Sequence, residues 1–250
     1  MTVAVSSTLT GAAADDPAVR FAFSDRADGN VSLAVGPPVA DARQRLARAV
    51  GVRSQDLVFM QQVHGAGVAV VGTAERGRGV GAHDDGIPSV DALVTTDTAV
   101  ALVVQVADCV PVLLADPGRA IAAVHAGRGG VVAGVVDATI ATLAPDVAAR
   151  VEAVIGPAIG GCCYEVEAEL ADAVAADLPA ARATTTWGTP ALDLPAAVAA
   201  QLRAAGVERI THTGGCTRCT PSRWFSHRSA PGEGRQAGVV VRTAHGDRHA

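Results

Sequence analysis

Two hydrophobic periodicities alternate along the chain. Apolar residues at three- and four-residue spacing predict helices, whereas short runs of consecutive apolar residues predict buried strands. The helical windows are 39–50, 132–143, 164–178 and 194–205. The strand windows are 57–63, 68–71, 92–94, 99–106, 112–114, 120–125, 151–155 and 238–242. This alternation predicts an α/β fold.

Several strand windows follow one another too closely for a helical crossover. Windows 112–114 and 120–125 are joined through Asp116-Pro117-Gly118, a sequence typical of a tight turn between antiparallel strands. We therefore expect a layered sandwich with mixed, largely antiparallel sheets flanked by helices. The segment 75–88, rich in glycine and charge, is expected to be an exposed loop in which His83 is solvated.

Length and composition predict one domain. The 250 residues are 49% hydrophobic and 18% charged, which is enough apolar material for one well-filled core. We expect a single domain at residues 18–250, preceded by a flexible N-terminal tail at residues 1–17. The tail has no basic segment before an apolar core, so we expect no secretory signal and a cytoplasmic location.

The longest apolar stretch, residues 98–115, approaches the length of a membrane span. It contains Gln105, Asp108 and Pro111 in its interior, so we interpret it as two buried strands. The 20 basic and 25 acidic residues give a net charge of -5 and form no block of like charge. We therefore expect neither a membrane nor a nucleic acid as a partner.

Three metal-type ligands lie at breaks in the strand pattern. His64 follows one strand window, His125 closes another, and Cys109 lies just before Pro111. Two imidazoles and a thiolate suit zinc, with copper as the alternative ion, and three protein ligands leave a fourth position for water or substrate. A second interpretation makes Cys109 a nucleophile with His64 or His125 as its base. Spacing alone does not show that the three residues converge.

A second group of ligands lies near the C-terminus. Cys216 and Cys219 form a C-x₂-C pair, flanked by His212 and His227, which together could form a closed structural zinc site. The chain has five cysteines, and two of them, Cys162 and Cys163, are adjacent in sequence. We expect free thiols or metal ligation rather than a framework of disulfides.

Two glycine-rich loops join strands to helices, at residues 127–130 and 156–161. Free backbone N–H groups at such a junction favour an anion such as phosphate. Neither loop matches the phosphate-binding pattern that ends in Gly-Lys-Ser/Thr or the dinucleotide-binding pattern G-x-G-x-x-G. Plain tight turns are therefore the alternative interpretation.

Eight motifs occur in order between residues 19 and 243: QQVHGAGV, DALVTT, VADCVPVLLAD, AAVHAGRGG, IGPAIGGCCYEV, LDLPAAVAAQL, WFSHR and GRQAGVVV. This series resembles the laccase-domain family, whose members are also named multicopper polyphenol oxidases or purine nucleoside phosphorylases. The resemblance implies a sandwich of the toxin-deamidase, cysteine hydrolase-like type. It also implies that residues 18–250 form one catalytic domain, with a metal bound by His64, Cys109 and His125.

The resemblance implies an enzyme acting on purine nucleosides. The expected reaction is phosphorolysis of adenosine, inosine or methylthioadenosine to the free base and ribose 1-phosphate, with adenosine deamination as a second activity. The nucleoside and phosphate are then the partners, and Asp108 joins the three metal ligands as a catalytic proton carrier. Further residues are expected to bind substrate: Arg26, Asn30, Asp91, Arg128, Gly129, Phe225, Arg228 and Arg235.

The motif at residues 125–130 departs from the family pattern. The usual His-Ala-Gly-Trp-Arg-Gly has Arg128 at the tryptophan position and Gly129 at the arginine position. Three hypotheses therefore remain: a zinc phosphorylase, a cysteine-dependent amide hydrolase acting on a cell-wall precursor, and a non-catalytic metal-binding protein. Seven histidines and no His-x-His pair argue against a true multicopper laccase.

Overall fold

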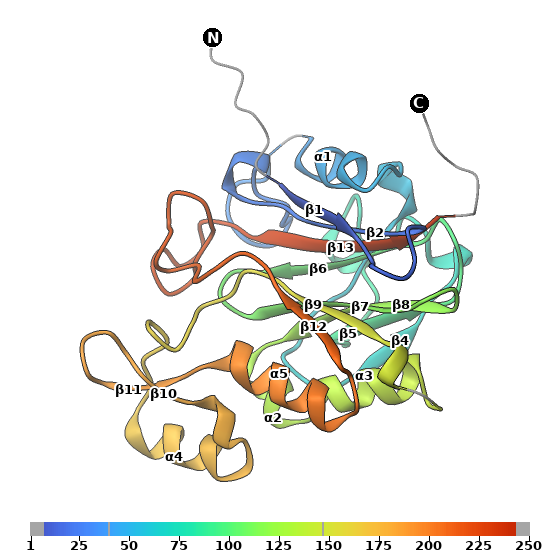
Figure 1. Cartoon of the computed structure of the whole chain (residues 1–250). Helices are drawn as coiled ribbons and strands as arrows, with labels where there is room; N and C mark the ends of the chain where they lie inside the picture. Colours follow the sequence, from blue (N-terminus) through green and yellow to red (C-terminus); the bar gives the residue numbers. More distant parts are fainter. Residues whose placement is uncertain (1–7, 40, 147, 244–250) are drawn as a thin grey trace.

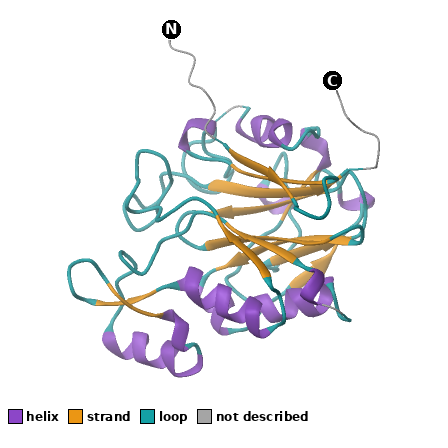
Figure 2. Cartoon of the chain, in the orientation of Figure 1, coloured by secondary structure: helices purple, strands orange, loops and turns teal. Residues whose placement is uncertain are grey.

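The computed structural model describes residues 8–39, 41–146 and 148–243, and it shows two β-sheets packed face to face between outer helices (Figures 1 and 2). The five-stranded sheet has the order β1 (Leu9–Ala12), β2 (Val19–Phe23), β13 (Gln236–Arg242), β6 (Ala101–Val106) and β3 (Leu57–Phe59). The six-stranded sheet has the order β12 (Arg209–His212), β9 (Glu152–Ile155), β7 (Val110–Asp116), β8 (Ala120–Ala126), β5 (Ala92–Thr95) and β4 (Val68–Val70).

Helices cover the outer face of each sheet. Helix α1 (Ala42–Ala49) packs on the five-stranded sheet, and α2 (Arg128–Val132), α3 (Val135–Leu143) and α5 (Leu194–Ala204) lie on the six-stranded sheet. Helix α4 (Ala168–Asp177) and the hairpin β10 (Arg182–Thr184) and β11 (Pro190–Leu192) project beside α5 (Figure 1). Short 3₁₀ helices lie at Arg26–Asp28, Ser54–Asp56, Thr73–Glu75, His83–Asp85, Ala148–Arg150 and Pro179–Ala181.

Both sheets are mixed and mostly antiparallel, as the sequence predicted. The parallel pairings are those of the edge strands β3, β4 and β12. The predicted hairpin between β7 and β8 is present, with Asp116 paired to Ala120 and Gly118 at φ 71° in its turn. A positive φ is a conformation that glycine adopts at low cost.

The apolar run 98–115 is long because its two strands are buried on both faces. Along β7, Val112 and Leu114 face the helices α3 and α5, whereas Leu113 faces the other sheet. Along β6, Leu102 faces the six-stranded sheet and Val103 faces α1. Alternation between two apolar layers makes the sequence of these strands apolar at nearly every position. Within the described ranges no helix is long and apolar enough to cross a membrane.

Several boundaries differ from the predictions. The tail predicted at residues 1–17 is wrong for Leu9–Ala12, which pairs with β2 as an antiparallel strand, and residues 1–7 lie outside the described residues. The window 132–143 is divided because Gly134, at φ 82°, separates α2 from α3. The window 164–178 becomes helical only at Ala168, and window 57–63 forms a strand only as far as Phe59.

Candidate active site and metal centre

A cavity of about 520 Å³ opens where β6 ends, β7 begins and β8 ends. The antiparallel register pairs Pro111 of β7 with His125 of β8, so Cys109, two residues before Pro111, lies beside the end of β8. His64 reaches the same point from the loop after β3. The fold thus brings together the three ligands that the sequence singled out.

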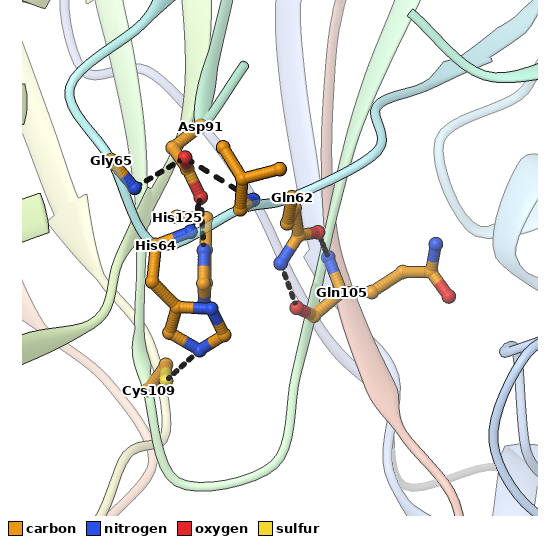
Figure 3. A network of polar contacts seen from close by, with 8 residues as sticks. Gln62, His64, Gly65, Asp91, Gln105, Cys109 and His125 are labelled. Atoms are coloured by element: carbon orange, nitrogen blue, oxygen red, sulfur yellow. Dashed lines mark hydrogen bonds and ion pairs between the residues drawn. The ribbon is translucent and has the colours of Figure 1, made fainter. Parts of the chain in front are cut away.

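His64 lies in a turn with a left-handed backbone, at φ 61°. The buried carboxylate of Asp91, which precedes β5, holds this turn (Figure 3). It accepts hydrogen bonds from the backbone N–H of His64 at 2.9 Å and from that of Gly65 at 2.7 Å. These bonds offset the cost of a conformation that is unfavourable for a residue with a side chain.

The same carboxylate orients His125. Its Oδ1 atom lies 2.7 Å from Nδ1 of the His125 ring, and the histidine side chain is almost fully buried. Because Nδ1 of His125 is bonded to Asp91, Nε2 is the ring nitrogen that remains available on the cavity side. A carboxylate behind a ligating histidine fixes the ring and raises its basicity, an arrangement common in zinc sites.

The three ligand atoms are close enough to share one ion. They all lie within 4.8 Å of one another, and His64 Nε2 is 3.8 Å from Cys109 Sγ (Figure 3). A tetrahedral zinc ion holds a nitrogen and a sulfur ligand about 3.5 Å apart. The His64 and His125 rings meet edge to face, at 82° and 4.7 Å between centroids. The donor set, its spacing and the supporting carboxylate therefore fit a zinc ion.

Burial and hydrogen bonding act in opposite directions on the two innermost ligands. Burial disfavours the charged form of Cys109, but hydrogen bonds with His125 and His64 outweigh it and lower the pKa of the thiol to about 6. Burial likewise opposes the charge on His125, but the hydrogen bonds with Asp91 and Cys109 raise its pKa to about 9. In the absence of a metal, these pKa values favour a thiolate beside an imidazolium between about pH 6 and about pH 9.

Gly127 lies against all three ligands. A Cβ atom at this position would meet His64 Cδ2 at 2.7 Å, Cys109 Sγ at 3.3 Å and His125 Cε1 at 3.4 Å. The backbone of Gly127 has an ordinary φ of -73°, so space rather than conformation requires the glycine. The strand-to-loop junction therefore carries a glycine because the ligands occupy the place of a side chain.

We expect Gly127→Ala to weaken zinc binding by at least about 10-fold, because His64 must move away from the other two ligands. Competition with a chromogenic chelator measures this change. Gly81→Ala is the control, since a Cβ there has no atom within 4 Å. Equal zinc affinity in the two variants would contradict the expectation.

Three arginines line the cavity beside the ligand group: Arg128, Arg228 and Arg235. Arg128 begins α2, and Arg228 lies 5.2 Å from the centroid of the Tyr164 ring. Burial lowers the pKa of Arg235, opposed by the nearby Cys109 and Asp108. Within the described residues no carboxylate forms an ion pair with these three guanidinium groups. Such a cluster suits a phosphate group.

Asp108 lines the cavity, but both of its carboxylate oxygens are engaged. Oδ1 accepts a hydrogen bond from the Thr217 hydroxyl at 2.6 Å, and Oδ2 accepts one from the backbone N–H of Arg228 at 2.7 Å. Its φ of 87° makes the turn between β6 and β7. The carboxylate thus connects the turn before Cys109 to the C-terminal loops. This structural role is additional to the proton-carrying role predicted from the sequence.

The remaining residues expected to bind substrate do not line the cavity: Arg26, Asn30, Asp91, Gly129 and Phe225. Arg26 pairs with Glu233 at 2.8 Å and lies over the Phe225 ring. The Asn30 amide donates to the carbonyl of Val35 at 2.7 Å, and its oxygen accepts from the N–H of Arg235. Asn30 therefore supports the loop before Arg235, and the buried Asp91 supports the two histidines.

Gly129 is closely packed against the backbone of His64. A Cβ atom at this position would lie 2.7 Å from the carbonyl oxygen of His64. An arginine at position 129, as in the family pattern, therefore requires the loop to shift. The side chain of Arg128, by contrast, reaches the cavity from the preceding position.

The sequence did not indicate an active-site position for several residues that line the cavity: Gln62, His83, Gln105, Tyr164 and His227. The Gln62 amide makes two bonds to the backbone of Gln105, at 2.7 and 2.9 Å, and the Gln105 side chain extends away from them (Figure 3). Gln105 is a polar residue within the otherwise apolar window 99–106, and this exception to the pattern could have indicated a functional position. His83 is exposed, as expected, and also borders the cavity.

The second predicted ligand group is wrong in two of its members. Cys216 and Cys219 do lie close together, but their partners within 4.8 Å are Cys162 and Cys163 rather than the two histidines. His212 is exposed on β12, and His227 borders the cavity. The adjacent cysteine pair arrives from a different loop, which sequence spacing does not reveal.

Comparison with known proteins defines the class of protein. The chain matches the family described as multi-copper polyphenol oxidoreductase laccase over residues 26–243, and it belongs to that family. It is similar to a purine nucleoside phosphorylase of Streptomyces coelicolor, with 46% identity over 88% of this chain and 94% of the relative. These matches confirm the family resemblance inferred from the motifs.

Two further relatives extend the comparison. An adenosine deaminase, RL5, from an unknown prokaryotic organism is 35% identical over 76% of each chain. The crystal structure of YlmD from Geobacillus stearothermophilus has a TM-score of 0.87 at 30% identity and covers 98% of each chain. The mixed sheets flanked by helices are therefore a fold shared with YlmD. These relatives are thus named as a purine nucleoside phosphorylase and an adenosine deaminase.

Proposed function

We propose that the protein is a zinc-dependent purine nucleoside phosphorylase that cleaves adenosine, inosine or methylthioadenosine with phosphate. The observation that carries this proposal is the convergence on one cavity of His64, Cys109 and His125 with three arginines that form no ion pair among the described residues. The volume of about 520 Å³ is suited to a small ligand of nucleoside size. Relatives named purine nucleoside phosphorylase support the same reaction.

Each set of residues has a separate task in phosphorolysis. Arg128, Arg228 and Arg235 bind phosphate and orient one of its oxygens toward the anomeric carbon of the ribose. The Gln105 amide and the Tyr164 ring hold the nucleoside by hydrogen bonding and stacking. His64, Cys109 and His125 would hold a zinc ion, which would supply a Lewis acid for negative charge that develops in the reaction. Asp91 keeps the two histidines in place throughout.

A deaminase activity belongs to the same proposal, because one relative is named adenosine deaminase. We assign the proton-carrying role in deamination to Asp108, which lines the cavity and whose carboxylate accepts hydrogen bonds from the Thr217 hydroxyl and the Arg228 backbone N–H. Deamination consumes water rather than phosphate. The two activities are separated by whether inosine appears from adenosine in phosphate-free buffer.

The direct test is release of hypoxanthine from inosine by zinc-loaded protein, with and without phosphate. We expect release only with phosphate, together with formation of ribose 1-phosphate, and loss of activity after removal of the metal. Elemental analysis of the purified protein distinguishes zinc from copper. Zinc-loaded protein that cleaves no purine nucleoside would overturn the proposal and favour the metal-binding alternative.

The arginine cluster gives a prediction of its own. We expect Arg128→Ala and Arg228→Ala each to raise the KM for phosphate at least about 10-fold, because each removes a charged hydrogen-bond donor from the anion. The KM for inosine should change much less. Arg203→Ala, on the exposed side of α5, is the matched control. An unchanged phosphate KM in both cavity variants would exclude this surface as the phosphate site.

A second function, cysteine-dependent amide hydrolysis, is favoured by one specific arrangement. The His125 ring interacts with the Cys109 thiol on one side and with the Asp91 carboxylate on the other. A thiol, an imidazole and a carboxylate in this order form the catalytic group of a cysteine hydrolase. This reaction requires the metal-free site, whereas phosphorolysis requires the loaded one. Hydrolysis of an amide substrate, such as a cell-wall precursor, by chelator-treated protein would favour it.

The metal-free site should show a reactive thiol. Because the pKa of Cys109 is lowered to about 6 from 9.0, the thiolate predominates above pH 6 and is lost as the pH falls below it. In chelator-treated protein, we expect the rate of Cys109 alkylation by iodoacetamide to be close to its maximum at pH 7. The rate should decline as the pH falls below 6. Peptide-resolved mass spectrometry measures it, and added zinc should protect the thiol. A rate that rises only near pH 9 would contradict the thiolate pair.

A further inference from the structure

A second group of ligands lies outside the cavity, where four cysteines from two loops meet. Cys162 and Cys163 follow β9, and Cys216 and Cys219 follow β12. Strands β9 and β12 are parallel neighbours, so both loops leave the six-stranded sheet at the same edge. The sheet topology thus brings together two pairs of thiols that are more than fifty residues apart in sequence.

The spacing of the sulfur atoms is that of ligands around one ion. Cys219 Sγ lies 3.6 Å from Cys162 Sγ and 3.5 Å from Cys163 Sγ, and all four sulfurs lie within 4.8 Å of one another. A tetrahedral zinc ion with bonds of about 2.3 Å holds its sulfurs about 3.8 Å apart. A disulfide requires about 2.05 Å, and all four cysteines are free.

The surroundings of the four cysteines are those of a metal–thiolate site. The backbone N–H of Gly160 points at Cys216 Sγ at 3.4 Å, a hydrogen bond that stabilises a thiolate. Arg218, between the two cysteines of the C-x₂-C pair, donates to the carbonyl of Cys163 at 3.1 Å. Four thiolates around a divalent ion carry a net charge of about -2, which a neighbouring guanidinium partly offsets.

We propose that Cys162, Cys163, Cys216 and Cys219 bind one zinc ion as four thiolates, in a closed structural site distinct from the ligand group in the cavity. Binding converts four thiols to thiolates and releases their protons to solvent. Because all four positions are taken by protein sulfur, no position remains for substrate. None of the four cysteines lines the cavity, so the proposal does not depend on the proposed function.

The proposed zinc ion would hold together the loops after β9 and β12, which form one wall of the cavity. Thr217, between Cys216 and Cys219, is fully buried and donates to the Asp108 carboxylate. Its backbone N–H bonds to the carbonyl of Ala158, and the next residue, Ile159, lines the cavity. A zinc ion joining the two loops therefore fixes the position of the turn that carries Cys109.

Zinc content per chain, measured by mass spectrometry on protein purified under reducing conditions, tests the proposal. With both sites filled, we expect two zinc ions in the wild type, one in Cys109→Ser, one in Cys216→Ser/Cys219→Ser and none in the combined variant. Cobalt replacement in Cys109→Ser should give the intense sulfur-to-cobalt absorption of a tetrahedral thiolate site. The same zinc content in Cys109→Ser with and without the Cys216/Cys219 substitutions would overturn the proposal.

A second measurement avoids variants that fail to fold. In Cys109→Ser protein, we expect zinc to protect all four cysteines from alkylation and a strong chelator to expose them, with a lower Tm that zinc restores. Alkylation equal with and without zinc would overturn the proposal, as would disulfides among these cysteines in protein purified without oxidant. If the cavity group binds no metal, wild type and Cys109→Ser both retain one zinc, so failure of the proposed function is distinguishable.

Discussion

Cys109→Ala and His125→Ala are each expected to lower phosphorolysis by at least about 100-fold and to remove one zinc ion per chain, because each deletes a ligand of a three-ligand site. The two variants differ in their side effects. Cys109→Ala leaves the Asp91–His125 pair intact, whereas His125→Ala leaves a fully buried carboxylate without its imidazole partner. We therefore expect a lower Tm in His125→Ala than in Cys109→Ala.

The measurement combines hypoxanthine release, zinc content and thermal unfolding for both variants. His212→Ala is the matched control, because this histidine is exposed on β12 and belongs to neither ligand group. Full hypoxanthine release by Cys109→Ala would contradict the zinc phosphorylase, since that reaction uses this sulfur as a metal ligand. Loss of hypoxanthine release with zinc content unchanged would instead indicate that Cys109 is needed for the reaction but not as a zinc ligand.

The central strands of the fold were predictable because strands that are buried on both faces consist of consecutive apolar residues. Strands β6, β7 and β8 are covered on both faces, and each was found from sequence. Two of the short edge strands, β1 and β12, were missed, since they are largely exposed or half-buried and carry no apolar run. Their positions depend on pairing with neighbours rather than on a local pattern.

The candidate site was predictable where a ligand stands at a strand end. In the β7–β8 hairpin, His125 pairs with Pro111, and Cys109 lies two residues before Pro111. Prediction of this hairpin is therefore enough to place His125 and Cys109 close together. The role of Asp91 was not predictable in this way, because its carboxylate faces inward to His64, Gly65 and His125 rather than into the cavity. Residue type indicates that a carboxylate can bind substrate, but only the structure shows which groups already engage it.

The same limit explains the cysteine cluster. The C-x₂-C pair at Cys216 and Cys219 was recognised, but its partners were sought nearby in sequence, at His212 and His227. The parallel pairing of β9 with β12 instead brings Cys162 and Cys163 to the pair. Long-range pairing of strands decides the ligand set, and no local spacing encodes it.

Asp91→Asn is expected to weaken zinc binding by about 10- to 100-fold, with a corresponding loss of activity at limiting zinc. Asparagine keeps the size of the side chain, but its NH₂ group cannot accept a hydrogen bond from a backbone N–H. The carboxylate now receives bonds from His64 and Gly65 while it also holds His125, and an amide cannot satisfy all of these partners. Both histidine ligands therefore lose their fixed orientation.

The experiment separates this positioning role from the substrate contact that the family resemblance suggested for Asp91. Chelator competition gives the zinc affinity, and inosine kinetics at saturating zinc give kcat and KM. Asp172→Asn, on the exposed side of α4, is the matched control. Weaker zinc affinity with a nearly unchanged KM assigns Asp91 to the support of the ligands. Unchanged zinc affinity with a raised KM would assign it to the nucleoside, which would require the buried carboxylate to reach the cavity during turnover.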